Sequence, residues 1–156
     1  MRKTILTAVL AAVIVMMAAS VSLAQHQITL GANGGYTFSW AELELEYKIN
    51  DLGFGAQFGF GYGRVEIAGF GRYYFPLNEL VNLAPEYELN LYAGVTPSVL
   101  LDFIPVFEAG FGLKVGPGID FRWDHLRVGA ELGYRFDTIY GVSHGFYTKA
   151  GIGYRF

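Results

Sequence analysis

Cysteine is absent from the sequence, and charged residues make up only 16% of it. Without cysteine the chain has no disulfide framework, no thiolate nucleophile, no thiolate metal site and no cysteine for a lipid anchor. A soluble exported domain would need more charge on its surface. Glycine and aromatic residues are abundant instead, with 21 Gly, 13 Phe and 11 Tyr. This balance suits a protein whose outer surface faces lipid.

The first 24 residues have the organisation of a secretory signal peptide. Arg2 and Lys3 precede an apolar run over residues 4–17, and small residues follow up to Ala24. The apolar run is near the lower length limit for a membrane-spanning helix, so a retained helix is the alternative. The small residues Ser22 and Ala24 favour cleavage between Ala24 and Gln25. We therefore expect a signal peptide over 1–24 and a single β-barrel domain over 25–156.

The region after the expected cleavage site is small and acidic. It contains 156 − 24 = 132 residues, which suits one domain. Loss of Arg2 and Lys3 leaves 11 − 2 = 9 basic residues against 14 acidic residues, a formal net charge of −5. An acidic chain does not attract nucleic acid, so we expect no nucleic-acid partner.

Alternation of apolar and polar residues with a period of two predicts an all-β fold. Eight segments show it, at approximately 28–38, 41–49, 52–62, 65–75, 87–99, 107–123, 126–136 and 146–156. Most are close to the 9 to 11 residues that a tilted transmembrane strand needs. The segments therefore predict a closed antiparallel barrel of eight transmembrane strands.

Fifteen charged residues in these segments share the face opposite the aliphatic side chains. They are Glu42, Glu44, Glu46, Lys48, Glu66, Arg72, Glu88, Lys114, Asp120, Arg122, Arg127, Glu131, Arg135, Lys149 and Arg155. A soluble barrel of the lipocalin type has the reverse pattern, so the faces predict lipid outside and a polar lumen. The interior of an eight-stranded barrel is just wide enough for side chains, so we expect these residues to form an ion-pair network. The alternative is that some of the carboxylates form a path for protons or ions.

Aromatic residues gather at both ends of the predicted strands, as in the aromatic girdles of transmembrane barrels. With an even number of strands and an exported N-terminus, both chain ends belong on the periplasmic side. The periplasmic group is then Tyr47, Tyr73, Phe75, Phe121, Trp123, Tyr154 and Phe156, and the external group is Phe38, Trp40, Phe60, Tyr62, Phe111, Phe136 and Phe146.

The C-terminal strand ends in apolar residues at alternate positions, Ile152, Tyr154 and Phe156. This ending resembles the assembly signal of bacterial outer-membrane β-barrels, and the whole region after residue 24 resembles small eight-stranded barrels of the OmpX and OmpA type. The resemblance implies insertion into the outer membrane, with outer-membrane lipid, the barrel assembly machinery and periplasmic chaperones as partners. It implies a structural or surface-interaction role, with a surface partner that the sequence does not identify.

Three features fit this interpretation less simply. Pro97 and Pro117 lie inside predicted strands, where proline removes a ladder hydrogen bond, so we expect a bulge or kink at each. The segment from Leu100 to Phe107 is an apolar external loop, which we expect to lie in the membrane interface, with contact to a protein partner as the alternative.

Catalytic and metal sites have little support in the sequence. Lipid A deacylases and palmitoyltransferases resemble this architecture and place a histidine and a serine near the external rim, where Ser143 and His144 are the only such pair. Adjacent residues of a strand point to opposite faces, so we expect no enzyme. His26, His125 and His144 do not form a spaced metal cluster, so we expect no metal site, and we expect no cofactor. A lipid A-modifying enzyme and a narrow channel or small-ligand carrier remain the alternative functions.

Overall fold

The structure is a computed structural model that describes residues 25–35 and 41–155. Its elements are β1 (Gln25–Gly35), β2 (Ala41–Ile49), β3 (Leu52–Gly61), β4 (Arg64–Pro76), α2 (Asn78–Val81), β5 (Tyr87–Asp102), β6 (Glu108–Trp123), β7 (Leu126–Asp137) and β8 (Ser143–Arg155). The expected signal peptide with its cleavage site after Ala24, the aromatic residues Phe38 and Trp40, and the C-terminal Phe156 lie outside the described residues.

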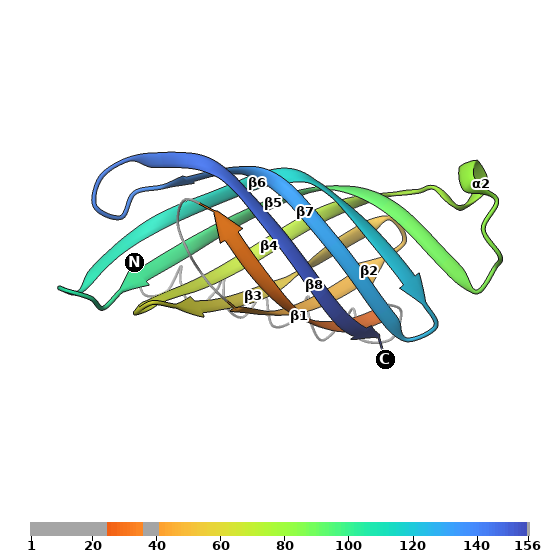
Figure 1. Cartoon of the computed structure of the whole chain (residues 1–156), viewed down its shortest axis with the longest axis horizontal. Coiled ribbons are helices and arrows are strands. Elements are labelled where there is room, and N and C mark those ends of the chain that lie inside the picture. The colour runs from red at the N-terminus through yellow and green to blue at the C-terminus, as the bar shows by residue number, and fades with distance from the viewer. Residues whose placement is uncertain (1–24, 36–40, 156) are drawn as a thin grey trace, which may run out of the picture.

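Each strand pairs antiparallel with the next one in the chain, and β1 also pairs with β8. The order of strands therefore returns to its start, and the strands surround a common axis (Figure 1). The predicted all-β antiparallel fold is confirmed. Among the residues that the structure describes, no helix has the length and apolar character needed to cross a bilayer.

The two faces of the sheet have opposite chemistry. Apolar side chains such as Phe58, Leu91 and Ile119 point outward and are each 43% exposed. Their strand neighbours on the inner face are buried and polar, and Glu44 and Glu66 are each only 1% exposed. In water this arrangement would expose hydrocarbon and bury charge, which are both unfavourable. It is favourable when hydrocarbon surrounds the barrel.

Short turns join the strands at the end where the C-terminus lies. Asn50 and Asp124 adopt positive φ angles of 53° and 54° in two of these turns, a conformation that Asn and Asp tolerate better than most residues. The third connection is longer and contains the one-turn helix α2. Asn78 ties it to β5, donating to the Tyr87 carbonyl and accepting from the Leu89 amide, both at 2.7 Å.

Pro97 and Pro117 are accommodated without an inserted residue. The β4–β5 ladder skips two pairs beside Pro97 and resumes in the same register, from Ala68↔Ser98 to Gly71↔Val95. The β6–β7 ladder does the same beside Pro117. Neither proline therefore has a bulge, because each one interrupts the ladder without shifting its register. The kink that was the other expectation stays a prediction. On their other sides Pro97 and Pro117 lie within the continuous β5–β6 ladder.

Candidate functional site

The fifteen charged residues predicted for the lumen lie on inward-facing positions. Twelve of them are buried: Glu42, Glu44, Glu46, Glu66, Arg72, Lys114, Asp120, Arg122, Arg127, Glu131, Arg135 and Lys149. The other three, Lys48, Glu88 and Arg155, are more exposed and lie at the end of the barrel where the chain terminates. The charged residues therefore line the inside along most of its length.

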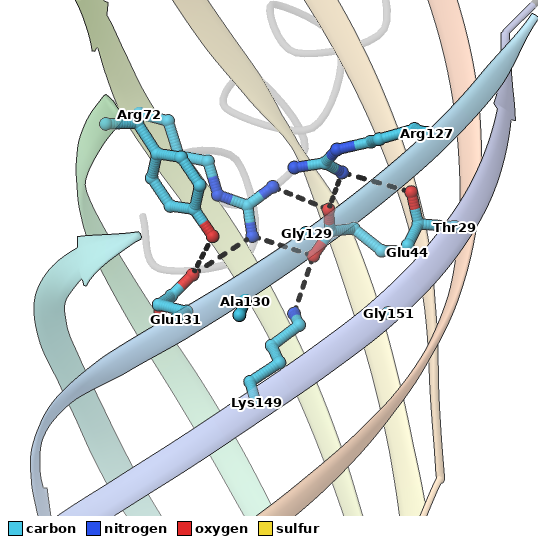
Figure 2. A pocket seen from close by; sticks show the side chains of 10 residues that line it. Thr29, Glu44, Arg72, Arg127, Gly129, Ala130, Glu131, Lys149 and Gly151 are labelled. Carbon is cyan, nitrogen blue, oxygen red and sulfur yellow. Dashed lines mark hydrogen bonds and ion pairs between the residues drawn. The ribbon is translucent and has the colours of Figure 1, made fainter. Parts of the chain in front are cut away.

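Glu44 of β2 is at the centre of the lumen and contacts three cations from three other strands (Figure 2). Arg72 of β4 donates to both of its carboxylate oxygens, at 2.5 and 2.9 Å. Lys149 of β8 lies at 2.6 Å and Arg127 of β7 at 3.2 Å. Arg72 also reaches across to Glu131, with 3.4 Å between Nη2 and Oε2. This cluster joins opposite walls of the barrel.

A second cluster lies toward the end that we assign as external. Glu42 forms ion pairs with Lys114 at 3.1 Å and with Lys149 at 2.9 Å. Lys114 also contacts Glu66 at 3.1 Å, and Glu66 contacts Arg135 at 3.3 Å. Lys149 therefore connects this cluster to the central one through its two glutamate partners.

A third cluster lies toward the end of the barrel where the chain terminates. Asp120 forms ion pairs with Arg127 and with Arg122, the latter at 2.6 Å. Glu88 lies 3.6 Å from Arg122 and 3.2 Å from Arg155. Because Arg127 also contacts Glu44, an unbroken series of ion pairs links all three clusters.

Several uncharged residues in this network could not be identified from charge alone. The hydroxyls of Tyr92 and Tyr147 donate to Glu131, and that of Tyr74 donates to Glu46. The Tyr74 ring also lies 4.6 Å from the ammonium of Lys48. All three tyrosines share strand parity with the charged residues, so parity was the signal that could have found them. Buried carboxylates need this many donors because an unpaired buried charge is costly.

The lumen has almost no free space at its centre. The cavity there is lined by Thr29, Glu44, Arg72, Tyr92, Arg127, Gly129, Ala130, Glu131, Lys149 and Gly151 and has a volume of about 10 Å³. This volume is at the lower limit for one water molecule. Inward-facing glycines make room for the large side chains. A Cβ atom on Gly118, for example, would overlap the Tyr92 ring.

Two apolar side chains cover the external end of the charged lumen. Leu100 is fully buried, and Ile139, from the loop between β7 and β8, is 4% exposed. Ile139 lies over Gly110, where a Cβ atom would come within 2.8 Å of the Ile139 amide nitrogen. The apolar external loop that we expected from Leu100 is therefore shorter, because β5 continues to Asp102 and turns Leu100 inward.

Ser143 and His144 do not form a catalytic pair. The Ser143 hydroxyl donates to Asp137 at 2.8 Å, on the inner side of the sheet. His144 is exposed on the outer face, where its ring contacts Tyr134 and Phe136. A serine nucleophile needs a base within hydrogen-bonding reach, and these two side chains point in opposite directions. Among residues 25–35 and 41–155, no group of three or more His, Cys, Asp or Glu residues could hold a metal ion.

The C-terminal strand presents its apolar residues to the outside. Ile152 is 54% and Tyr154 49% exposed. Tyr154 pairs with Ile28 of β1 and Leu126 of β7, so β8 lies between the first strand and its own hairpin partner. This strand is the one that joins the two ends of the sheet.

The chain is similar to solved structures of bacterial outer-membrane proteins. The N-terminal β-barrel domain of Pseudomonas aeruginosa OprF aligns with a TM-score of 0.55 at 12% identity, over 85% of this chain and 97% of that chain. Neisserial surface protein A (NspA) aligns with a TM-score of 0.49 at 13% identity, over 85% and 96%. Ail, the attachment invasion locus protein of Yersinia pestis, gives 0.31 at 15% identity, over 85% and 97%. The sequence matches no family model and no curated protein. The OprF barrel confirms the resemblance to small outer-membrane barrels at the level of the fold.

Proposed function

We propose that this chain is an integral outer-membrane protein, a closed barrel of eight transmembrane strands with the signal peptide 1–24 removed after Ala24. Its role is structural or involves surface contacts, and its lumen does not conduct ions. Outer-membrane lipid surrounds the barrel, and the barrel assembly machinery and periplasmic chaperones act on the chain during biogenesis. The outward apolar face and the inward charged face support this placement, because only a lipid surrounding makes both favourable.

The observation that carries the proposal of a closed lumen is the series of ion pairs across the barrel. Arg72 contacts Glu44 on one wall and Glu131 on another, which blocks the centre with a side chain held by charge on both sides. The remaining central cavity of about 10 Å³ has no room for a hydrated ion. Leu100 and Ile139 add buried apolar side chains near the external end.

Planar-bilayer recording tests the closed lumen. We expect purified protein to insert without producing steady conductance. Arg72→Ala, which removes the side chain that crosses the centre, is the matched variant, and it should conduct if water fills the space left behind. Steady, ion-selective openings by the unmodified protein would establish the channel alternative and refute the closed lumen.

The lipid A-modifying enzyme is the alternative from another class. The opposite directions of Ser143 and His144 argue against it. Mass spectrometry of lipid A from cells with and without the protein separates the two functions. We expect identical acylation patterns, and a gained or lost acyl chain that depends on Ser143 would favour the enzyme.

A further inference from the structure

The hairpin formed by β5 and β6 is much longer than the strands on the other side of the barrel. β5 and β6 have 16 residues each, whereas β2 has 9 and β3 has 10. At a rise of about 3.3 Å per residue and a tilt of about 40°, β6 spans about 40 Å along the membrane normal and β2 about 23 Å. The apolar band of such barrels is about 25 Å tall. With the same rise and tilt, β4, β7 and β8, with 12 or 13 residues, span about 30–33 Å, so the β5–β6 side exceeds the band most, by about 15 Å.

The excess length lies at the external end. The β6–β7 ladder ends at Gly112↔Asp137, whereas the β5–β6 ladder continues to Asp102↔Glu108. Figure 1 shows the teal turn between β5 and β6 reaching farther than the blue turn between β7 and β8. The extension carries a turn of apolar residues, 103–107, at its tip.

The outer face of this extension remains apolar to its tip. Phe111 is 71% exposed, and Phe103, Ile104, Val106 and Phe107 are between 52% and 66% exposed. These side chains continue the outward row that begins at the periplasmic end of β6, without a charged residue in it. The surface that faces lipid in the proposed barrel is thus continuous with the surface of the tip.

Hydrogen bonds hold the tip so that its apolar side chains stay outside the barrel mouth. The Phe103 amide donates to the Gly63 carbonyl at 2.9 Å, and Arg64 forms an ion pair with Asp102 at 3.0 Å. The Tyr140 hydroxyl donates to the Ile104 carbonyl at 3.3 Å. These polar contacts lie on the inner side of the tip, and its apolar side chains remain exposed on the outer side.

We propose that the tip, residues 103–107, lies among the lipid headgroups of the outer leaflet, and that the barrel leans toward its β5–β6 side to place it there. The inference rests on the proposed outer-membrane location. One-sided excess of apolar surface is relieved by tilting, which lowers the tall side into the membrane and costs only a fraction of a kcal/mol per Å. The tip contains Phe103 and Phe107, and aromatic residues are common where the apolar band of a barrel meets the headgroups.

The absence of native cysteine allows a direct test with single-cysteine variants carrying an environment-sensitive fluorophore, folded into phosphatidylcholine vesicles. Val106→Cys reports on the tip, and Leu132→Cys reports on the outer face at the middle of β7, where Leu132 is 55% exposed. Val142→Cys, at a residue 82% exposed in the loop between β7 and β8, is the control for an external position in water. Quenching by headgroup nitroxide lipids, by acyl-chain nitroxide lipids and by aqueous iodide is measured for each.

We expect the Val106 probe to lose emission with headgroup nitroxides and to resist iodide. The Leu132 probe should lose emission with acyl-chain nitroxides, and the Val142 probe should lose emission with iodide only. A Val106 probe that behaves like the Val142 probe would overturn the inference and leave the barrel in the membrane. A Leu132 probe that iodide quenches would overturn the proposed location itself. Protection of the Val106 probe that appears only at high protein-to-lipid ratio would assign the tip to a second copy of the chain and also overturn the inference.

Discussion

Replacing Glu44 by glutamine should destabilise the barrel far more than the same change at Glu88. Glu44 is buried and contacts three cations, so Glu44→Gln leaves Arg72, Arg127 and Lys149 with one fewer counter-charge. Breaking a buried ion pair from one side costs about 3–5 kcal/mol. The side chain of Glu88 is 39% exposed, and exposed pairs contribute about 0–1 kcal/mol. Glutamine keeps the size of the side chain, so the difference isolates the charge.

Equilibrium unfolding by urea in lipid vesicles measures this difference. It is followed by tryptophan fluorescence and by the gel migration of unboiled samples. With an m-value of about 2 kcal/mol per M, Glu44→Gln should lower the midpoint by about 2 M and Glu88→Gln by less than about 0.5 M. The double variant Glu44→Gln with Arg72→Met should lose less unfolding free energy than the two single variants summed, by about 1 kcal/mol or more. Equal shifts for Glu44 and Glu88, or strict additivity in the cycle, would refute the network.

Three further predictions concern the fold and its assembly. The folded protein should give a β-sheet circular dichroism spectrum in detergent. It should also migrate differently on gels before and after boiling, because the backbone groups of a closed barrel are paired internally. A helical spectrum would contradict the fold. Gly118→Ala should destabilise the folded barrel by about 1–3 kcal/mol, because the new Cβ would displace the Tyr92 ring. Gly71→Ala is the control and should be nearly neutral, because no atom lies within 4 Å of its new Cβ. Equal unfolding midpoints for the two variants would show that the lumen adapts to the added methyl group. Deleting Phe156, or replacing Tyr154 by a charged residue, should reduce the amount of folded protein in outer-membrane fractions more than it lowers the unfolding free energy, and wild-type amounts would argue against an assembly signal.

Local alternation was enough to predict the all-β fold and the inward positions of the charged residues. A strand turns successive side chains to opposite faces whatever it pairs with, so Glu42, Glu44 and Glu46 share a face before any partner is known. The same alternation predicted that the side chains of Ser143 and His144 point to opposite faces. Strand limits were less certain, and β5 and β8 extend farther toward the external loops than the alternation indicated.

The sequence by itself thus determined that one face is charged and the other apolar, because that property depends on a period of two within each strand. Only the tertiary structure decided which charges meet. Lys149 and Glu44 are 105 residues apart and come together because β8 pairs with β1 and β1 with β2. Their contact depends on the register of several strands and the width of the barrel, which no single segment encodes. The same is true of the Tyr92 hydroxyl on Glu131 and of Ile139 over the mouth of the lumen, since each position is set by pairings around the barrel and not by its neighbours in the chain.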